Sequence, residues 1–301
     1  MTAAAGEVVV AGPATGTTGP AATTGPADLT ALRDTFRSLG EVVVAFSGGA
    51  DSAFVAKVAT DTLGAHRVLC VTAVSPSLAP EERDDCRALA AEWGLRHLEV
   101  TTHELADPAY TANDGSRCYH CKASLMAALG PVTAAAGPGA TVVLGVNLDD
   151  LSDHRPGQSA AAERGAVFPL VTAGFTKADV RAWSRRLGLR TWDKPAAACL
   201  ASRVPYGTRV TFTTLDSVAR AESGLRALGF RQLRVRHYDH TARIEVPAED
   251  LTEVVARRDE VSAAVHAAGY RYVTVDLDGF RSGNLNQSLD TGGHDTTEEA
   301  P

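Results

Sequence analysis

The sequence predicts an α/β protein in which a doubly wound parallel sheet forms the main domain and a smaller α+β domain follows. Short β-branched runs alternate with helical segments through the first two thirds of the chain, which is the pattern of a parallel sheet with helices on both faces. A glycine turn follows the first of these runs and opens a helix. After Thr211 the order changes to helix, two strands, helix and strand. With 301 residues, the chain is long enough for both domains.

The first predicted strand, residues 42–46, is short, β-branched and unbroken, as expected of a strand buried on both faces. The other strands of the main domain are predicted at 67–74, 96–102 and 141–147, and a helix that begins with proline at 80–95. In the smaller domain the predicted elements are a helix at 214–230, strands at 232–238 and 242–247, a helix or pair of helices at 248–270, and a last strand at 271–279.

Composition sets the limits of the two domains. Residues 1–27 and 286–301 contain almost no large apolar side chains, so they cannot bury enough surface to offset the entropy of ordering, and we expect both to be disordered. Between them, residues 28–208 are assigned to the main domain and 209–285 to the smaller one.

Charge and cysteine content restrict the class of protein. The formal net charge of −7 argues against a broad nucleic-acid surface, and no apolar run is long enough to span a membrane. The N-terminus has no pattern of a secretory signal. Five cysteines, an odd number, indicate thiols rather than a disulfide framework. We therefore expect a cytoplasmic protein that binds neither membranes nor nucleic acid.

The glycine turn has the sequence Ser47-Gly48-Gly49-Ala50-Asp51-Ser52. A strand, a glycine turn and a helix N-terminus bring backbone N–H groups together and form an anion site, most often for phosphate. The lysine of a Walker A loop is absent, and the pattern is not GxGxxG. A carboxylate among phosphate donors indicates a bridging Mg²⁺ held by Asp51. The alternative is a structural turn in which Asp51 caps the helix.

Three cysteines lie in settings that suggest chemistry. Cys118 and Cys121 form a C-x-x-C pair in "RCYHCK", and Cys199 lies in "AAACLASRVPYG". Three such thiolates could bind zinc with His120 or another ligand, hold an iron–sulfur cluster with one iron left open, or act as a redox dithiol. The pair could also be two small apolar residues on one helix face. The other two cysteines, Cys70 and Cys86, are expected in the core.

Arginines near these cysteines suggest an anion site. Ser202 and Arg203 follow Cys199, and an adjacent guanidinium favours a thiolate and can bind phosphate or carboxylate. Arg234 and Arg236 are two positions apart on a predicted strand, hence on one face of it. They could form an anion clamp or an ion-paired sheet surface.

The turn resembles the SGGxDS signature of the PP-loop ATP pyrophosphatases, and residues 168–195 resemble the stretch that follows the nucleotide site in amide-forming members. Over about residues 28–285 the chain resembles the LarE family, through SGGADS, RCYHCK, KPAAACLASRVPYG and the RVR strand. The resemblance implies an ATP-dependent sulfur transferase. Such an enzyme adenylates a carboxylate of pyridinium-3,5-biscarboxylic acid mononucleotide and replaces oxygen by sulfur, which gives the thiocarboxylate precursor of the nickel-pincer cofactor of lactate racemase.

The resemblance also implies roles for single residues. The turn would hold ATP through its pyrophosphate, with Asp51 on magnesium. In some members one cysteine gives up its sulfur, whereas in others three cysteines hold a 4Fe-4S cluster that carries a transferable sulfide. Because this chain has all three positions, we expect the cluster type, supplied by a sulfide or persulfide donor, and a hexameric assembly. The expected metal ligands are Cys118, Cys121 and Cys199, and the expected catalytic residues are Asp51, Cys199 and Arg203. The residues expected to bind the nucleotide are Ser47, Gly48, Gly49, Asp51 and Ser52. The residues expected to bind the substrate are Ser202, Arg203, Arg234, Arg236, Glu222 and Glu245.

Three other functions compete with this interpretation. A tRNA thiolation enzyme could pair the same turn with a cluster, but the net charge of −7 disfavours it. An ammonia-dependent amide-forming synthetase would leave the cysteines without a role. The third alternative is a nucleotide- or zinc-binding regulator without turnover.

Overall fold

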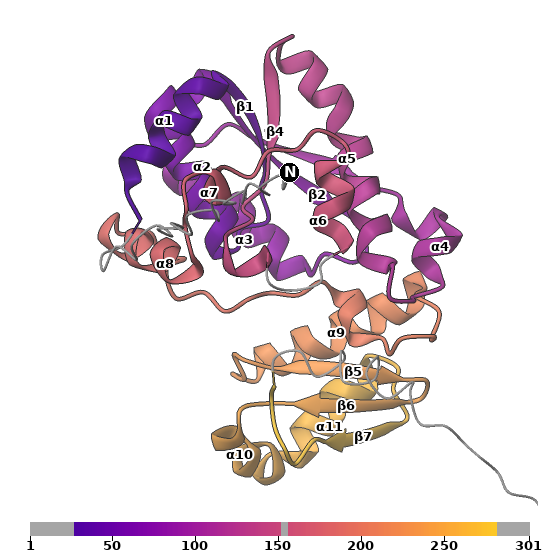
Figure 1. Ribbon diagram of the computed structural model, residues 1–301. Coiled ribbons are helices and arrows are strands. Elements are labelled where there is room, and N and C mark those ends of the chain that lie inside the picture. The colour runs from indigo at the N-terminus through magenta and orange to yellow at the C-terminus, as the bar shows by residue number, and fades with distance from the viewer. Residues whose placement is uncertain (1–26, 152–155, 282–301) are drawn as a thin grey trace, which may run out of the picture.

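The structure is a computed structural model that describes residues 27–151 and 156–281 (Figure 1). The segments predicted to be disordered, 1–27 and 286–301, lie outside the described residues except for Ala27, whose N–H donates to Asp179 Oδ1 at 3.1 Å. Residues 282–285 of the predicted smaller domain also lie outside them. Among the helices of the described part, none combines the length and apolar character needed to cross a membrane.

The main domain is built on a four-stranded parallel sheet with the order β3-β2-β1-β4. The chain therefore runs outward from β1 to β3 and then returns to the other side of β1. This reversal is the mark of a doubly wound sheet, so the predicted fold class is confirmed. The strands are β1 (Glu41–Ala45), β2 (Val68–Val74), β3 (His97–Thr101) and β4 (Ala140–Val143).

Alternate side chains of β1 face the two layers of helices. Val42 and Val44 pack with α1, α2 and α3 on one face, and Val43 packs with α5 and α6 on the other. All three valines are fully buried, which is why this strand shows no polar alternation. The helices of the main domain are α1 (Leu29–Leu39), α2 (Ala50–Leu63), α3 (Pro80–Trp93), α4 (Pro108–Thr111), α5 (Arg117–Ala136), α6 (Pro156–Ala162), α7 (Pro169–Thr172) and α8 (Lys177–Arg186).

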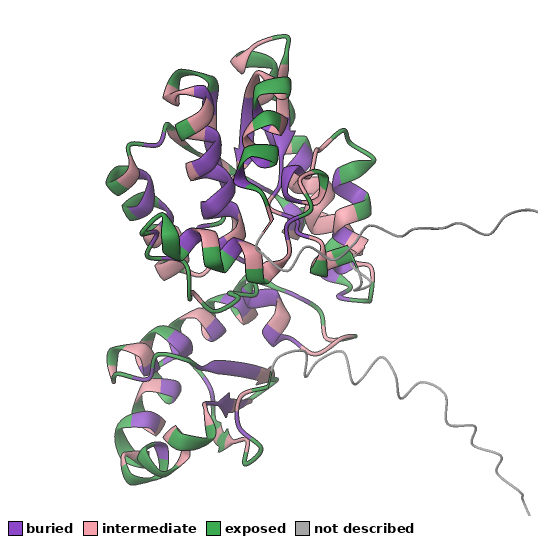
Figure 2. Cartoon of the chain, turned by 60° about the vertical axis from the view of Figure 1, so that its left-hand side comes forward, coloured by how far each residue is buried: buried purple, intermediate pink, exposed green. Residues whose placement is uncertain are grey.

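The smaller domain packs helices against a mixed three-stranded sheet of order β5-β6-β7, in which β5 and β6 are antiparallel and β6 and β7 parallel. Its core includes Val235 and Ile244 of the sheet and Leu225 and Val265 of the helices, and Figure 2 shows the buried strands inside it. The elements are α9 (Phe212–Ala227), β5 (Arg234–Tyr238), β6 (Thr241–Glu245), α10 (Leu251–Ala256), α11 (Arg258–Ala267) and β7 (Tyr272–Val275). The predicted helix or pair of helices at 248–270 is therefore a pair.

The prediction of a fourth strand over 141–147 is wrong in its second half, because β4 ends at Val143. The chain then turns toward the start of α2. A Cβ atom at Gly145 would lie 2.8 Å from Ser52 N and 2.9 Å from the Asp51 carbonyl carbon, so only glycine fits here without displacing backbone. The apolar run continues past the strand because Leu144 and Val146 remain buried.

Five short 3₁₀ turns connect these elements within the described residues. They are η1 (Ala65–Arg67), η2 (Glu104–Ala106), η3 (Asp149–Leu151), η4 (Leu200–Arg203) and η5 (Ala248–Asp250). Of these, η4 is the one that directly follows Cys199, and it therefore belongs to the site.

Candidate functional site

The glycine turn lies at the carboxyl end of β1, beside the point where the strand order reverses. Ligands of doubly wound sheets bind at this place, because loops from neighbouring strands diverge there. Gly49 is the N-cap of α2, with no side chain to occupy the first N–H groups of the helix. Gly48 has φ +67°, a left-handed conformation that favours glycine, and a Cβ there would lie 2.9 Å from Cys86 Sγ.

Hydroxyl groups hold the turn in shape. Ser52 Oγ accepts a hydrogen bond from Ser47 N at 3.2 Å and donates to the Gly49 carbonyl at 3.2 Å. The Ser47 and Ser52 hydroxyls are 3.0 Å apart. The two serines therefore link the strand end to the first turn of α2.

Asp51 is paired with a residue far along the chain. Its Oδ2 lies 2.5 Å from Lys177 Nζ, and Asn147 Nδ2 approaches Oδ1 at 3.4 Å. Gly49 provides no side-chain cap and Asp51 is directed to Lys177, so the helix-cap alternative is not what the structure shows. Lys177 is the first residue of α8, and a capping box between Thr176 and Asp179 fixes that helix start.

A second lysine reaches the turn from the segment before Cys199. Lys194 Nζ donates to the Gly48 carbonyl at 3.2 Å, to Glu82 at 2.7 Å and to Asp85 at 2.7 Å. All three ammonium protons are thus donated to protein groups, so Lys194 stabilises the turn and has no donor left for a ligand. Sequence reasoning missed both lysines, although they lie within the segment 168–195 that resembles amide-forming enzymes.

Cys199 lies on an exposed turn that is fixed from inside. Leu200 N donates to the Ser77 carbonyl at 2.9 Å, which places the turn beside the segment that follows β2. Arg203 Nη1 donates to the carbonyls of Ala198 at 2.7 Å and Cys199 at 3.2 Å, and Ser202 Oγ donates to the Cys199 carbonyl at 2.7 Å. The glycine turn and Cys199 therefore lie on the same edge of the sheet.

Cys118 and Cys121 lie one turn apart at the start of α5, the first exposed and the second half-buried. Cys121 packs against the cluster that contains Leu200 and Ala201. Burial, together with negative charge at Cys199 and Cys118, raises the pKa of Cys121 to about 12. The packing of Cys121 against Leu200 and Ala201 places the start of α5 beside the turn that carries Cys199.

No three His, Cys, Asp or Glu side chains in 27–151 and 156–281 are grouped so that they could hold a single metal ion. His120 Nδ1 lies 3.1 Å from Asp107 Oδ2, so its ring is already engaged. Cys70 and Cys86 are fully buried, as expected of core residues.

Glu222 and Glu245, expected near the substrate, are both fully buried and receive hydrogen bonds from arginines. Glu222 accepts from Arg203 at 2.8 Å, from Arg226 at 2.9 Å and from Val235 N at 3.1 Å. The guanidinium of Arg203 is thereby engaged by Glu222 and by the Cys199 turn. We conclude that Glu222 orients Arg203.

The two arginines of β5 differ in their partners. Arg236 pairs with Glu245 through Nε at 2.9 Å and Nη2 at 3.0 Å and donates to the Ser202 carbonyl at 2.8 Å. Arg234, in contrast, has no carboxylate partner among the residues that the structure describes, and its guanidinium lies over the Phe280 ring at 4.5 Å. Burial and the charges of Arg203 and Arg236 lower its pKa. Arg234 is thus the arginine of β5 whose charge a bound anion could neutralise.

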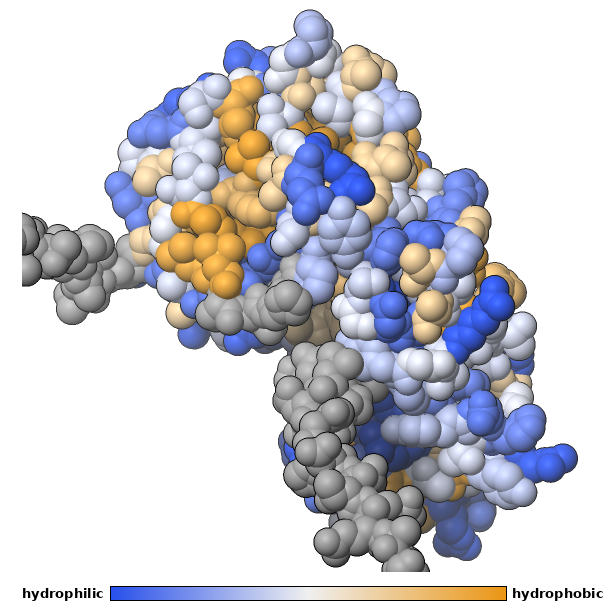
Figure 3. All heavy atoms as spheres, turned by 45° about the vertical axis from the view of Figure 1, so that its right-hand side comes forward, coloured by the Kyte–Doolittle hydropathy of each residue, from blue (hydrophilic) through white to orange (hydrophobic). Residues whose placement is uncertain are grey.

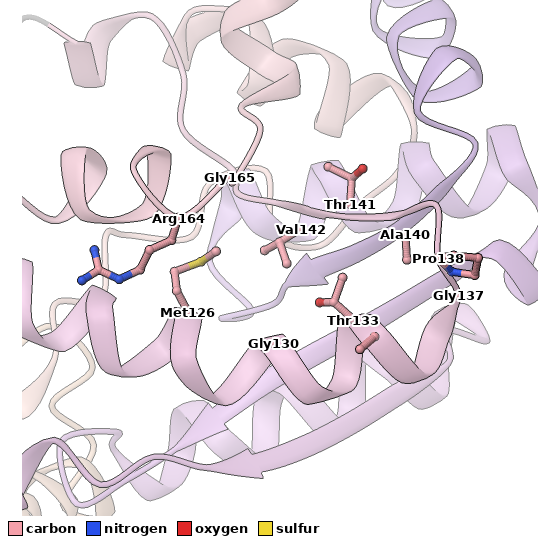
Figure 4. Close-up of a pocket in the computed structure, with 11 residues that line it drawn as sticks. Met126, Gly130, Thr133, Gly137, Pro138, Ala140, Thr141, Val142, Arg164 and Gly165 are labelled. Carbon is pink, nitrogen blue, oxygen red and sulfur yellow. The ribbon is translucent and has the colours of Figure 1, made fainter.

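A cavity of about 530 Å³ lies elsewhere, between α5, β4 and the turn at Gly165 (Figure 4). Its lining includes Gly137, Pro138 and Ala140, at the amino end of β4. Because the glycine turn and the cysteines lie toward the carboxyl ends of the strands, this cavity is separate from the candidate site.

Comparisons with known proteins agree with this arrangement. The family model of NAD synthase matches residues 31–123, which contain β1, the glycine turn and α2. A protein of Synechocystis sp., named "Uncharacterized protein slr1717", is 48% identical over 260 residues, or 86% of this chain and 96% of its own length. Pyridinium-3,5-bisthiocarboxylic acid mononucleotide synthase of Lactiplantibacillus plantarum is 40% identical over 253 residues, 84% of this chain and 91% of that protein. This chain therefore belongs to the family of pyridinium-3,5-bisthiocarboxylic acid mononucleotide synthase.

Proposed function

We propose that the protein is an ATP-dependent sulfur transferase acting on pyridinium-3,5-biscarboxylic acid mononucleotide. ATP adenylates a substrate carboxylate, pyrophosphate leaves, and sulfur replaces the adenylated oxygen with release of AMP. The observation that carries the proposal is the placement of the glycine turn and the Cys199 turn on one edge of the sheet, in a chain 40% identical to the synthase. The activated carboxylate and the thiols would then share one cleft.

The glycine turn and α2 would bind the leaving pyrophosphate. Their N–H groups and the positive helix end act on charge that develops as the phosphate bond breaks. Mg²⁺, when bound with ATP, would neutralise phosphate charge, with Asp51 as its protein ligand. Release of Asp51 to the metal would free Lys177 to neutralise the same phosphates. Lys194 would keep Gly48 in its left-handed conformation throughout.

The substrate carries a phosphate and two carboxylates, so its site needs positive charge. Arg234 offers that charge, because no described carboxylate pairs with it. Arg203 and Arg236 would face the same anion while Glu222 and Glu245 fix their orientation. Ser202 lies between Cys199 and these arginines and would add a hydroxyl contact.

We propose that Cys118, Cys121 and Cys199 hold a 4Fe-4S cluster. The supporting observation is that Cys121 packs against the cluster that contains Leu200 and Ala201, which brings the C-x-x-C turn of α5 beside the turn that carries Cys199. Thiolates are the ligands that iron–sulfur clusters use. When bound, a cluster held by three thiolates supplies a transferable sulfide at its fourth iron. The alternative within this function is that Cys199 gives up its own sulfur.

A hexamer is proposed from the resemblance. β7 is an edge strand of the smaller sheet; its first residue, Tyr272, is 57% exposed, and Leu277, two residues after the strand, is 85% exposed. On the face shown in Figure 3, apolar side chains also gather over the larger domain. Light scattering on the purified protein would give the assembly mass, and a monomeric mass would exclude the hexamer.

The test of function is an anaerobic turnover experiment with ATP, Mg²⁺, the mononucleotide and sulfide, followed by mass spectrometry. The expected product carries the mass gain of an oxygen-to-sulfur exchange, with AMP formed in equal amount. Iron and acid-labile sulfide are measured on the same protein. Product formed without iron, with Cys199 losing one H₂S, would identify the cysteine as the donor. Absence of AMP and product under all conditions would overturn the function.

A further inference from the structure

Arg117 is a buried arginine for which the mechanism above has no role. The described residues contain four buried arginines, and two of them, Arg203 and Arg236, pair with buried carboxylates. Arg117 is 5% exposed and has no carboxylate partner in 27–151 or 156–281. Its hydrogen bonds go to Asn113 Oδ1 at 2.5 Å and to the Ala201 carbonyl at 2.8 Å.

These bonds connect the two segments that carry the cysteines. Arg117 directly precedes Cys118 at the start of α5, whereas Ala201 lies in η4, two residues after Cys199. A single Nη1 thus holds the first turn of α5 against the Cys199 turn. Because a guanidinium presents its donors in a rigid plane, a contact of this kind fixes orientation as well as distance.

Asn113 extends the connection. It has φ +58°, uncommon for a residue other than glycine, and its Nδ2 donates to the carbonyls of Pro205 at 2.7 Å and Thr208 at 2.8 Å. The Arg117 guanidinium also lies 5.5 Å from the centre of the Tyr206 ring. Side chains of 113 and 117 therefore hold the backbone of 201–208 at several points.

A buried charge that has only neutral hydrogen-bond acceptors destabilises the fold, and an apolar side chain of the same size would usually give a more stable protein. The charge is explained if anionic sulfur lies nearby. Cys118 is the next residue, and the Cys199 turn is the partner that Arg117 holds.

We propose that Arg117 is a positioning residue that holds Cys118 and Cys121 against Cys199 before any iron binds, with its charge offsetting that of the sulfur ligands. The assignment of these thiols as cluster ligands rests on the proposed function. The connection between the two segments does not, because it is made by hydrogen bonds within the protein.

Two variants and a matched control test this role. Arg117→Met removes the charge and the planar donors, and Arg117→Lys keeps the charge alone. Arg164→Met is the control. The Arg164 guanidinium lies 5.4 Å from the ring of Tyr119, a residue in the same turn of α5 as Cys118, and it donates a hydrogen bond to the Ala160 carbonyl, outside η4.

The first measurement uses iron-free protein and a short bis-alkylating thiol reagent, with peptide mapping of links between Cys199 and Cys118 or Cys121. Wild type and Arg164→Met are expected to cross-link, and both Arg117 variants to do so much more slowly. The second measurement is iron loss to a chelator after anaerobic reconstitution, expected to be about 10- to 100-fold faster in the Arg117 variants. ATP–pyrophosphate exchange is expected to remain near the wild-type rate.

Wild-type cross-linking and iron retention in Arg117→Met would overturn the proposal. If wild type takes up no iron but cross-links as described, the proposed sulfur source fails and the positioning role stands. If Arg117→Met does not fold, the proposal is tested by cross-linking of Arg117→Lys and by hydrogen exchange of the iron-free wild-type protein. The amides of 117–122 and 199–203 are expected to be protected, and exchange at the rate of an unfolded peptide would contradict preorganisation.

Discussion

The glycine turn, which is the proposed nucleotide turn, and the region that contains the three cysteines and Arg203, Arg234 and Arg236 (the cysteine–arginine region) differ in how they are built. The first consists of six consecutive residues at the end of one strand, and its charged pair, Asp51 and Lys177, is partly exposed. The second is assembled from α5, η4, α9, β5 and β6, and the carboxylates that orient its arginines, Glu222 and Glu245, are fully buried. A partly exposed pair can exchange partners when a ligand arrives, whereas a buried pair must stay intact for the fold. Variants in the two regions should therefore fail in different ways.

The largest effect is expected for Glu222→Gln. This change replaces a buried carboxylate, which accepts hydrogen bonds from Arg203, Arg226 and a backbone N–H, by a neutral amide. Leaving a buried charge without its partner costs about 3–5 kcal/mol, so the free energy of unfolding should fall by about that amount. Denaturant unfolding measures it. The control is Glu253→Gln, which removes an exposed i,i+4 pair with Arg257 and should leave the free energy of unfolding almost unchanged. Equal effects of the two would remove the distinction between the regions.

The opposite pattern is expected for Asp51→Asn. ATP–pyrophosphate exchange in the presence of substrate should fall about 10²- to 10³-fold, because charge on the leaving pyrophosphate loses its stabilisation. The free energy of unfolding and the iron content should remain near wild type, since the Asp51 pair is partly exposed. Loss of iron together with exchange activity would show that the two regions are not separable.

A smaller effect is expected for Gly145→Ala, which tests the packing between the end of β4 and the nucleotide turn. The added methyl would meet backbone at Ser52 and Asp51, so the turn must shift, at a cost of about 1–3 kcal/mol. ATP affinity, measured by calorimetry, should weaken. Gly139→Ala is the matched control at the other end of β4, because a Cβ there has no atom within 4 Å. Equal ATP affinity in both variants would contradict the close approach.

The smallest effect on stability is expected for Glu99→Gln, a substitution on β3 that lies outside both regions. Hydrogen bonds from Arg83 and Arg87 lower the pKa of Glu99 to about 2. Because the folded pKa lies below the unfolded value of about 4.3, the stabilisation is present above pH 4.3 and is lost as the pH falls toward 2. Melting temperatures of wild type and Glu99→Gln should differ slightly at pH 6 and converge near pH 2. A constant difference across this range would contradict the low pKa.

The sequence by itself predicted the parts of the protein that depend on local sequence patterns. The doubly wound sheet follows from alternating strand and helix periods, and the nucleotide turn follows from SGGADS after a buried strand. The burial of Cys70 and Cys86 follows from their strand and helix settings. Each of these depends on residues close together along the chain, so spacing alone carries the information.

The tertiary structure decided which distant side chains meet. Lys177 and Lys194 reach the nucleotide turn from more than 120 residues away, and no spacing rule predicts that Lys177 faces Asp51 while Lys194 holds Gly48. The sequence likewise could not show that Arg236 is neutralised by Glu245 whereas Arg234 has no carboxylate partner in the part of the chain that the structure describes. The physical reason is that the doubly wound sheet brings loops and helix starts remote in sequence to one edge, and that charge pairing there and between the antiparallel strands β5 and β6 depends on how the side chains pack in three dimensions.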